Sequence, residues 1–366
     1  MLSRFNSIFS SPKDTPSDIA TDITLESDSQ TWRSSFKSNQ KVIRLKHMLS
    51  APQIDIGSLK KAVCSGCPEG EYSMREICWK LLLGYLPSRT ERHNEVLDRK
   101  RKEYSSLIKE RTPYITGKSN SADDSITGLV RQISLDVPRT YLGTTATILS
   151  SPRVRCIIER VLFIWAQRNP ACGYVQGMND LTTPIMVVLL QGASLREIEA
   201  VTVEDLSDEQ LDSIEADLYW MLSKLLQDLQ DHYTFSQPGI QSMVKRLDEI
   251  LTRKDPLLKE HLELEQVPLL QVTFRWYNCL LARELNLQCL IRLFDTLLAE
   301  DDGFTVFIVY FSAALLSRMS TDLRKLDFQA IMMLMTAPTP PCPLTALDME
   351  TLIAETYVLN SLFPPE

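Results

Sequence analysis

Two short segments of this 366-residue chain carry residue types that can act on a bound partner. The first is Ile133-Ser-Leu-Asp136-Val-Pro138-Arg139-Thr140. Pro138 fixes the backbone immediately before the arginine, and the carboxylate of Asp136 lies on the other side of the proline. This pattern would hold the guanidinium of Arg139, a delocalised cation with a fork of donors, at a defined angle.

The second segment, Ala171-Cys-Gly173-Tyr174-Val-Gln176-Gly177-Met-Asn179-Asp180, follows a predicted helix stop. Because glycines lie on both sides of Gln176, its backbone can approach a partner closely. We expect Asn179 or Asp180 to cap the helix that follows. The segment would then present an amide side chain at the start of a helix.

Each segment also has a purely structural interpretation. Asp136 could cap a turn while Arg139 is solvated, and the glycines could simply relieve tight packing. The residue types alone leave both interpretations open.

No other pattern in the chain supports chemistry of its own. Thr112-Pro-Tyr-Ile-Thr-Gly-Lys-Ser119 matches the second half of a phosphate-binding loop, but it lacks the first glycine and no strand precedes it. We predict a polar surface loop there and no bound nucleotide. Patterns typical of hydrolases, zinc proteases, calcium loops and protein kinases are absent from the sequence.

The eight cysteines do not form the framework of a small disulfide-rich protein. Cys64 and Cys67 have the spacing of a metal or redox pair, but the sequence has no second such pair and no cluster of histidines. We therefore expect a turn at these residues and no metal site, and most of the cysteines should be reduced core residues.

Composition favours a helical protein without a membrane span. Glycine accounts for only 12 residues, which disfavours folds that depend on glycine turns. The longest apolar stretch, Val306 to Leu316, is shorter than the ~20 residues that a spanning helix needs. A formal charge of −8 gives little support for nucleic-acid binding. We interpret the acidic run at 197–217 and the mixed charges at 89–111 as solvated helix faces and loops.

Apolar residues recur at helical spacing from Val42 onward, with polar interruptions at about 112–127 and 192–208. A helix is expected over Arg155–Arg168, ended by Asn169-Pro170, and another after a capping box at Ser207–Gln210. Further stripes lie at 240–251, 267–285, 287–299, 304–317 and 326–335. The predicted fold is all-α, preceded by a disordered arm at residues 1–43 that is rich in Ser and Thr.

The two segments together resemble the hallmark motifs IxxDxxR and YxQ of the TBC domain family, the GTPase-activating proteins for Rab GTPases. Ile133, Asp136 and Arg139 match the first motif, and Tyr174 and Gln176 match the second. Neither motif is specific alone, but their order, separation and flanking residues make the pair specific.

Flanking strings extend the resemblance from about Val42 to at least Thr336. They include Trp79–Pro87 near the family's opening segment and Arg292–Asp295 in its later helices. Other strings resemble the subgroup associated with Golgi Rabs: Gln132–Thr140, Asp217–Trp220, Tyr233–Phe235 and Gln237–Gln241. Phe294 replaces a tryptophan common in the family and should remain an aromatic core residue. Tyr141-Leu142 replaces a common Asn and Pro.

The resemblance implies a bundle of many helices in two lobes, with a TBC domain at 44–366 divided at about 44–225 and 226–366. It implies that Arg139 and Gln176 act in trans on the GTP of a Rab GTPase, supported by Asp136 and Tyr174. The Rab would hold GTP and Mg²⁺, so this chain would be an enzyme activator without a cofactor. It would regulate vesicle traffic from the cytoplasm, with peripheral association at the Golgi or other endomembranes.

Two alternatives belong to other classes. The first is a non-catalytic all-α adaptor that binds a GTPase or another partner through the same groove, which the presence of both Arg139 and Gln176 disfavours. The second, a helical-repeat scaffold, would need a repeat of about 30–45 residues, and the sequence shows none.

Overall fold

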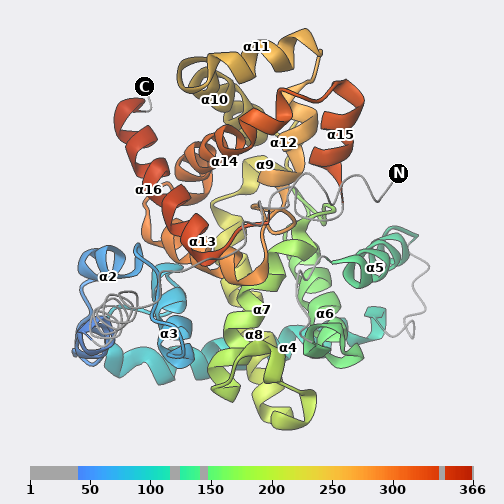
Figure 1. Ribbon diagram of the computed structural model, residues 1–366. Coiled ribbons are helices and arrows are strands. Elements are labelled where there is room, and N and C mark those ends of the chain that lie inside the picture. The colour runs from blue at the N-terminus through green and yellow to red at the C-terminus, as the bar shows by residue number, and fades with distance from the viewer. Residues whose placement is uncertain (1–39, 116–123, 141–146, 338–342, 365–366) are drawn as a thin grey trace, which may run out of the picture. The chain divides into compact units, whose positions relative to one another are not determined.

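The apolar stripes of the sequence form the buried faces of helices in a computed structural model that describes residues 40–115, 124–140, 147–337 and 343–364 (Figure 1). Residues 45–366 form one compact unit. A helix spans residues 40–49. The described residues contain no β-strand beyond an isolated bridge between Gln53 and Arg89, so the predicted all-α class is confirmed. The α-helices that follow are α2 (Ile56–Val63), α3 (Tyr72–Leu82), α4 (His93–Ile115), α5 (Asp124–Asp136), α6 (Pro152–Arg168), α7 (Met178–Ser194), α8 (Asp208–Gln227), α9 (Gln230–Tyr233), α10 (Pro238–Lys254), α11 (Pro256–Leu264), α12 (Leu269–Asn278), α13 (Leu287–Ala299), α14 (Ile308–Leu323), α15 (Phe328–Thr336) and α16 (Ala346–Leu362).

Helix α7 forms the centre of the part of the fold that carries both candidate segments. Every residue from Met178 to Gln191 is buried, and α7 packs against α3, α6, α8 and α13. Helix α6 confirms the prediction for 155–168. Its N-cap is Ser151, whose side chain accepts a hydrogen bond from the Val154 N–H, and its C-cap is Asn169. The core helices thus fix the start of α7, where the glutamine of the second segment lies.

The capping box predicted at Ser207–Gln210 is present at the start of α8. Its apolar stripe is buried, as predicted. Two acidic residues of α8 contradict the expectation of a solvated acidic run, because Glu215 and Asp217 are buried. Glu215 pairs with Arg160 and Asp217 with Arg101 and Lys80.

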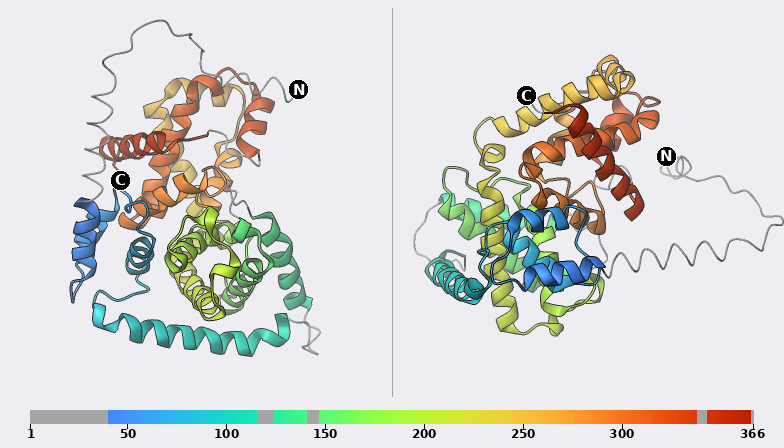
Figure 2. Two further views of the ribbon diagram at one scale, coloured as in Figure 1. Left: turned by 60° about the horizontal axis from the view of Figure 1, so that its bottom comes forward. Right: turned by 90° about the vertical axis from the view of Figure 1, so that its left-hand side faces the viewer.

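The mixed-charge stretch 89–111 is therefore only partly a solvated surface. Arg101 Nε and a terminal guanidinium nitrogen lie 3.0 and 2.7 Å from the two carboxylate oxygens of Asp217. Tyr104 is buried and donates to Glu215 over 2.9 Å. Figure 2 shows α4 as a long helix along the outside of the bundle. The ion pair to Asp217 and the hydrogen bond to Glu215 join it to α8.

The stripe predicted at 267–285 is not one helix. Helix α12 ends at Asn278, and Leu280 and Leu281 follow with φ of 48° and 61°. Two consecutive left-handed residues cannot continue an α-helix, so the chain turns there although both leucines are buried. Phe294 on α13 is buried as expected and stacks on Trp79, with ring centroids 5.8 Å apart.

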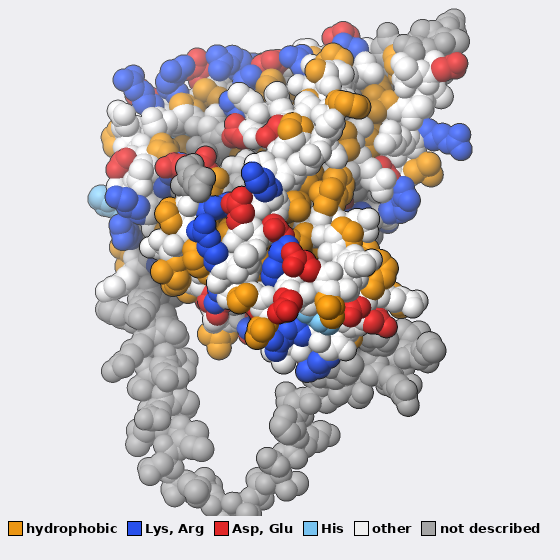
Figure 3. Space-filling view, turned by 90° about the horizontal axis from the view of Figure 1, so that it is seen from above, with side chains coloured by type: hydrophobic (Ala, Val, Ile, Leu, Met, Phe, Trp, Pro, Cys, Tyr) orange, Lys and Arg blue, Asp and Glu red, His pale blue; other side chains and the backbone are white. Residues whose placement is uncertain are grey.

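The stretch Gly303–Leu323, a π-helical turn followed by α14, is long and apolar enough to cross a membrane by length and composition. In this structure 72% of its most apolar window is buried against other helices, as in the core helix of a globular domain. Figure 3 shows basic, acidic and apolar side chains interspersed on the face of the described residues that is seen from above.

Several sequence expectations concern the connecting segments. The predicted turn at Cys64 follows α2, and Gly66 there has a left-handed φ of 85°. The surface loop predicted at 112–119 is wrong in its first half, because α4 continues to Ile115. Residues 116–119, residues 1–39 of the predicted arm and Tyr141-Leu142 lie outside the described residues.

Candidate functional site

The arginine segment, residues 133–140, is a helix end that places one cation at the surface. Ile133 and Val137 anchor it in the core, and a short 3₁₀ turn, Val137–Arg139, follows α5. The Arg139 side chain is 65% exposed and forms an ion pair with Asp136. Its Nε also donates to the carbonyl oxygen of Leu135 over 2.9 Å. The guanidinium is therefore held at a defined angle, as the sequence predicted.

Asp136 does not serve as the turn cap of the purely structural interpretation. It makes no side-chain capping bond to the 3₁₀ turn, and it is only 4% exposed. Its carboxylate faces Arg139 on one side and Tyr174 on the other. A buried carboxylate thus links the exposed arginine to the second segment.

The glutamine segment, residues 171–177, places one amide at the surface immediately before α7. Gln176 is exposed, whereas Tyr174 is buried. Gly177 occupies the N-cap position with a φ of 109°, and no side chain caps the helix. The expectation that Asn179 or Asp180 would be the cap is wrong, because the helix begins at Met178, before both of them.

Asn179 and Asp180 instead hold the surrounding backbone. Asn179 Oδ1 accepts from the Gly177 N–H over 3.0 Å, and its Nδ2 donates to Thr140 Oγ1 over 2.9 Å. Asp180 is fully buried and accepts from Nε of Arg283 over 3.0 Å. Both side chains therefore connect the start of α7 to other parts of the chain.

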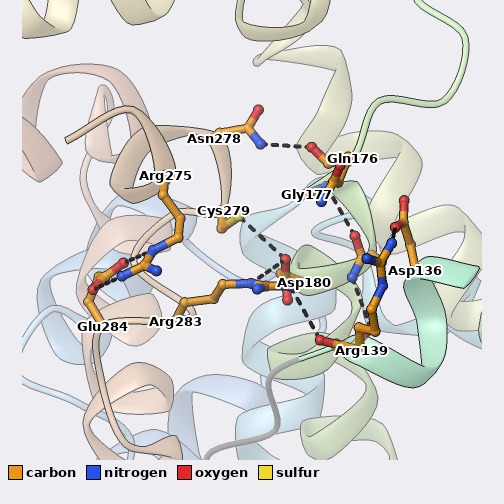
Figure 4. A network of polar contacts seen from close by, with 12 residues as sticks. Asp136, Arg139, Gln176, Gly177, Asp180, Arg275, Asn278, Cys279, Arg283 and Glu284 are labelled. Atoms are coloured by element: carbon orange, nitrogen blue, oxygen red, sulfur yellow. Dashed lines mark hydrogen bonds and ion pairs between the residues drawn. The ribbon is translucent and has the colours of Figure 1, made fainter. Parts of the chain in front are cut away.

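A buried tyrosine joins the two segments. The hydroxyl oxygen of Tyr174 lies 3.1 Å from Asp136 Oδ2 and 3.2 Å from Asn179 Oδ1, so its single proton can be donated to either oxygen. Burial, together with the nearby Asp136 charge, raises the pKa of Tyr174 well above its ordinary value. The phenol is therefore a neutral donor at physiological pH. Figure 4 shows the two segments side by side.

Sequence reasoning missed the role of the end of α12 and of the turn that follows it. Asn278 Nδ2 donates to the backbone carbonyl of Gln176 over 2.8 Å. A terminal nitrogen of Arg283 lies 3.4 Å from the backbone carbonyl oxygen of Arg139 (Figure 4). Neither residue is among the site residues predicted from the sequence, where the only local signal for Asn278 is a polar side chain in the apolar stripe 267–285.

The geometry presents a cation and a neutral amide to whatever binds here, while their acidic and phenolic partners are buried. An exposed guanidinium offers charge and directed donors to an anion, and an exposed amide can both donate and accept. Within the described ranges no group of three or more His, Cys, Asp or Glu side chains could hold a metal ion. The groups available for chemistry are thus suited to an anionic group on a partner.

Comparison with known proteins identifies the family. Residues 72–323 match the Rab-GTPase-TBC domain, RabGAP-TBC. The chain belongs to this family. The chain is 42% identical over 342 residues to human TBC1 domain family member 22A, a match that covers 92% of this chain and 64% of that protein. It is 39% identical to GTPase-activating protein gyp1 of Schizosaccharomyces pombe, covering 89% of this chain and 63% of the relative.

Solved structures agree with the sequence relatives. The crystal structure of the Ypt/Rab-GAP domain of Gyp1p matches with a TM-score of 0.76 and 34% identity, covering 89% of this chain and 99% of that one. A Chlamydomonas flagellar RabGAP TBC domain matches with a TM-score of 0.58 at 19% identity, which shows the shared fold alone. The expected TBC fold is confirmed. The chain spans less than two thirds of the length of the human and S. pombe relatives.

Proposed function

We propose that this TBC domain is a GTPase-activating protein that acts on a Rab-family GTPase in its GTP state. The observation that carries the proposal is that Arg139 and Gln176 are both exposed on segments joined by the buried contact between Tyr174 and Asp136. The names of relatives support it, since the S. pombe protein is called a GTPase-activating protein and the Gyp1p structure a Ypt/Rab-GAP domain.

Arg139 is proposed to act as an arginine finger. Negative charge spreads over the phosphoryl oxygens as the γ-phosphate of GTP is transferred to water. A guanidinium placed against those oxygens stabilises the transition state more than the ground state, and its planar fork can bond two oxygens at once. To reach the nucleotide, the exposed end of Arg139 would exchange its contact with Asp136 for contacts with phosphate.

Gln176 is proposed to act as a second finger. Its amide oxygen can accept a proton of the attacking water while its NH₂ group donates toward the phosphate. This is the role that a GTPase's own glutamine plays in other systems. Gln176 is exposed in this structure, so a docked partner can reach it.

Asp136 and Tyr174 are proposed as supporting residues. Because both are buried and bonded to each other, they fix the spacing of the two segments without touching the nucleotide. The Rab would bring GTP and Mg²⁺, so the TBC domain would need no cofactor. The same proposal includes a role in vesicle traffic and a cytoplasmic location with peripheral association at the Golgi or other endomembranes. It also includes a division of the domain into two lobes near residue 225. They rest on the family resemblance and its Golgi-Rab strings.

The competing function is a non-catalytic adaptor that binds a GTPase through the same surface. A single-turnover hydrolysis assay on a panel of GTP-loaded Rabs separates the two. We expect stimulation of at least one Rab that is lost in Arg139→Ala. Binding of a GTP-loaded Rab without any stimulation across the panel would establish the adaptor function instead.

A further inference from the structure

We propose that Asn278 is a positioning residue that sets the place of Gln176 for GTP hydrolysis. The inference rests on the proposed function and extends it to the last residue of α12, distant in sequence from both motifs. Asn278 is 6% exposed, and its Nδ2 donates over 2.8 Å to the backbone carbonyl of Gln176. The bond holds the glutamine's main chain and leaves its side-chain amide exposed.

Asn278 also lies very close to Gly177, the residue after Gln176. A Cβ placed on Gly177 would lie 2.1 Å from Asn278 Nδ2 and 3.2 Å from Cys279 Sγ. Only a glycine lets this amide approach the backbone so closely. The glycines around Gln176 predicted that a partner approaches this backbone closely. At Gly177 the close neighbour is Asn278, a residue of the same chain.

Asn278 is poorly explained as a residue kept for stability alone. Its Oδ1 is buried and has no hydrogen-bond partner among the described residues. A buried polar atom without a partner costs stability, so an apolar side chain would serve packing better. The amide nitrogen Nδ2 does have a hydrogen-bond partner, and that partner is the backbone carbonyl of Gln176.

The backbone just after Asn278 is conformationally strained, which also lowers stability. Leu280 and Leu281 adopt left-handed φ values of 48° and 61°, which disfavour side chains with a Cβ. Strain of this kind collects where a fold over-determines a functional geometry. The turn also places Arg283, which contacts buried Asp180 and the backbone of Arg139. The end of α12 and the turn that follows it therefore contact both segments that carry the proposed fingers (Figure 4).

Tyr233 fixes the turn from the other side. Its hydroxyl donates to the backbone carbonyl of Asn278 over 2.8 Å, and Tyr233 is 4% exposed. Asn278 is thus held by its main chain while it holds Gln176 with its side chain. A loss of the Asn278 amide should loosen Gln176 without opening the turn itself.

The chain offers a matched control. Asn286, on the same connection, also donates from Nδ2 to a backbone carbonyl over 2.8 Å, but its acceptor is Leu344. Its Oδ1 caps α13 through the Cys289 N–H. Asn286→Ala therefore removes an equivalent bond that does not touch either segment.

The test is single-turnover hydrolysis on a GTP-loaded Rab that the wild type stimulates, with Asn278→Ala, Asn278→Asp and Asn286→Ala. We expect both Asn278 variants to lose about 10- to 100-fold in kcat with KM within about twofold, since small misplacements of a catalytic group have effects of this size. Asn278→Asp keeps the shape but turns an acceptor toward the Gln176 carbonyl. Asn286→Ala should lose thermal stability and keep its kcat.

A double-mutant cycle separates positioning from general damage. In a Gln176→Ala background no side-chain amide is left to misplace, so adding Asn278→Ala should cost less than about twofold further. A full multiplicative loss in that background would overturn the proposal, as would an unchanged kcat in Asn278→Ala.

Amide hydrogen exchange tests the positioning contact without any Rab. Exchange in residues 174–178 should rise in Asn278→Ala and stay at the wild-type rate in Asn286→Ala; equal rates in all three proteins would overturn the proposal. If the segment loosens but no Rab is stimulated by the wild type, the proposed function has failed, and with it the catalytic role given to Asn278.

Discussion

The hydroxyl oxygen of Tyr174 lies 3.1 Å from Oδ2 of Asp136, a residue 38 positions earlier that also pairs with Arg139. One buried contact thus ties the segment that carries the exposed arginine to the segment that carries the exposed glutamine. Tyr174→Phe removes only the oxygen and leaves Asp136 without this partner. We expect about a tenfold loss in kcat, equivalent to ~1–2 kcal/mol for one lost buried hydrogen bond, with KM nearly unchanged.

The control for this variant is Tyr104→Phe, which also removes a buried hydroxyl that donates to a carboxylate, Glu215, but lies in the α4–α8 contact. Both variants should lose stability. A loss of kcat in Tyr104→Phe equal to that in Tyr174→Phe would contradict a specific role for the Tyr174–Asp136 contact.

If Gln176 acts as a second finger, it takes over the role of the Rab's own switch glutamine. A Rab whose own switch glutamine is replaced by Ala should still be stimulated by the wild-type domain, whereas Gln176→Ala should be defective on the normal Rab. The loss should be large but smaller than for Arg139, because orienting a neutral water involves less charge stabilisation. Hydrolysis is measured for all four combinations of protein and Rab. The two-finger mechanism would be wrong if the Rab variant resisted stimulation while Gln176→Ala remained active. In that case Arg139 would act together with the Rab's own glutamine.

The two glycines beside Gln176 should respond differently to a methyl group. Gly177→Ala creates a contact of 2.1 Å with Asn278 Nδ2 at a φ of 109°, and we expect a loss of more than tenfold in kcat. Gly173 has a φ of 62° with nothing within 4 Å of its Cβ position, so Gly173→Ala should cost about 1–2 kcal/mol of stability and little kcat. Equal kcat values for the two variants would show that the Asn278 contact does not matter for activity.

Acid should destabilise the fold through His232. This side chain is fully buried, and burial lowers its pKa below the ordinary value of 6.5, although the neighbouring Asp231 opposes the shift. Below pH 6.5 the unfolded chain therefore binds a proton that the folded chain does not, and the free energy of unfolding falls as pH falls. The slope for one group reaches at most about 1.4 kcal/mol per pH unit.

Chemical denaturation between pH 7 and 5 measures this slope. His232→Gln should flatten it, because glutamine keeps a polar side chain at this buried position but cannot take up the proton. An unchanged slope in His232→Gln would show that other groups cause the acid sensitivity.

Local patterns predicted much of this molecule. The spacing of apolar residues predicted α6 and α8, and the hallmark motifs indicated Arg139 and Gln176 as candidate site residues, which the structure places at the surface. Both signals lie within a few residues of sequence. Asn278 contacts Gln176 across 102 residues, and periodicity carries no information about such pairs. Glu215 and Asp217 were misassigned for the same reason, since their partners lie on helices far away in sequence. The N-cap of α7 was also misassigned, because Gly177 occupies that position without a capping side chain.

Single-turnover hydrolysis by GTP-loaded Rabs, with wild type, Arg139→Ala and Arg139→Lys, is the most direct test of the proposed GTPase-activating function. Circular dichroism and binding to Rab·GDP·AlFₓ accompany it, so that folding and docking are measured separately from chemistry. An arginine supplied in trans increases the rate of hydrolysis by on the order of 10³–10⁵. Both variants should remain folded and lose most of this stimulation. Lysine should not replace the arginine, because it lacks the planar fork of donors. Stimulation by folded Arg139→Ala within about threefold of the wild type, set against that magnitude, would contradict the arginine finger and the function built on it.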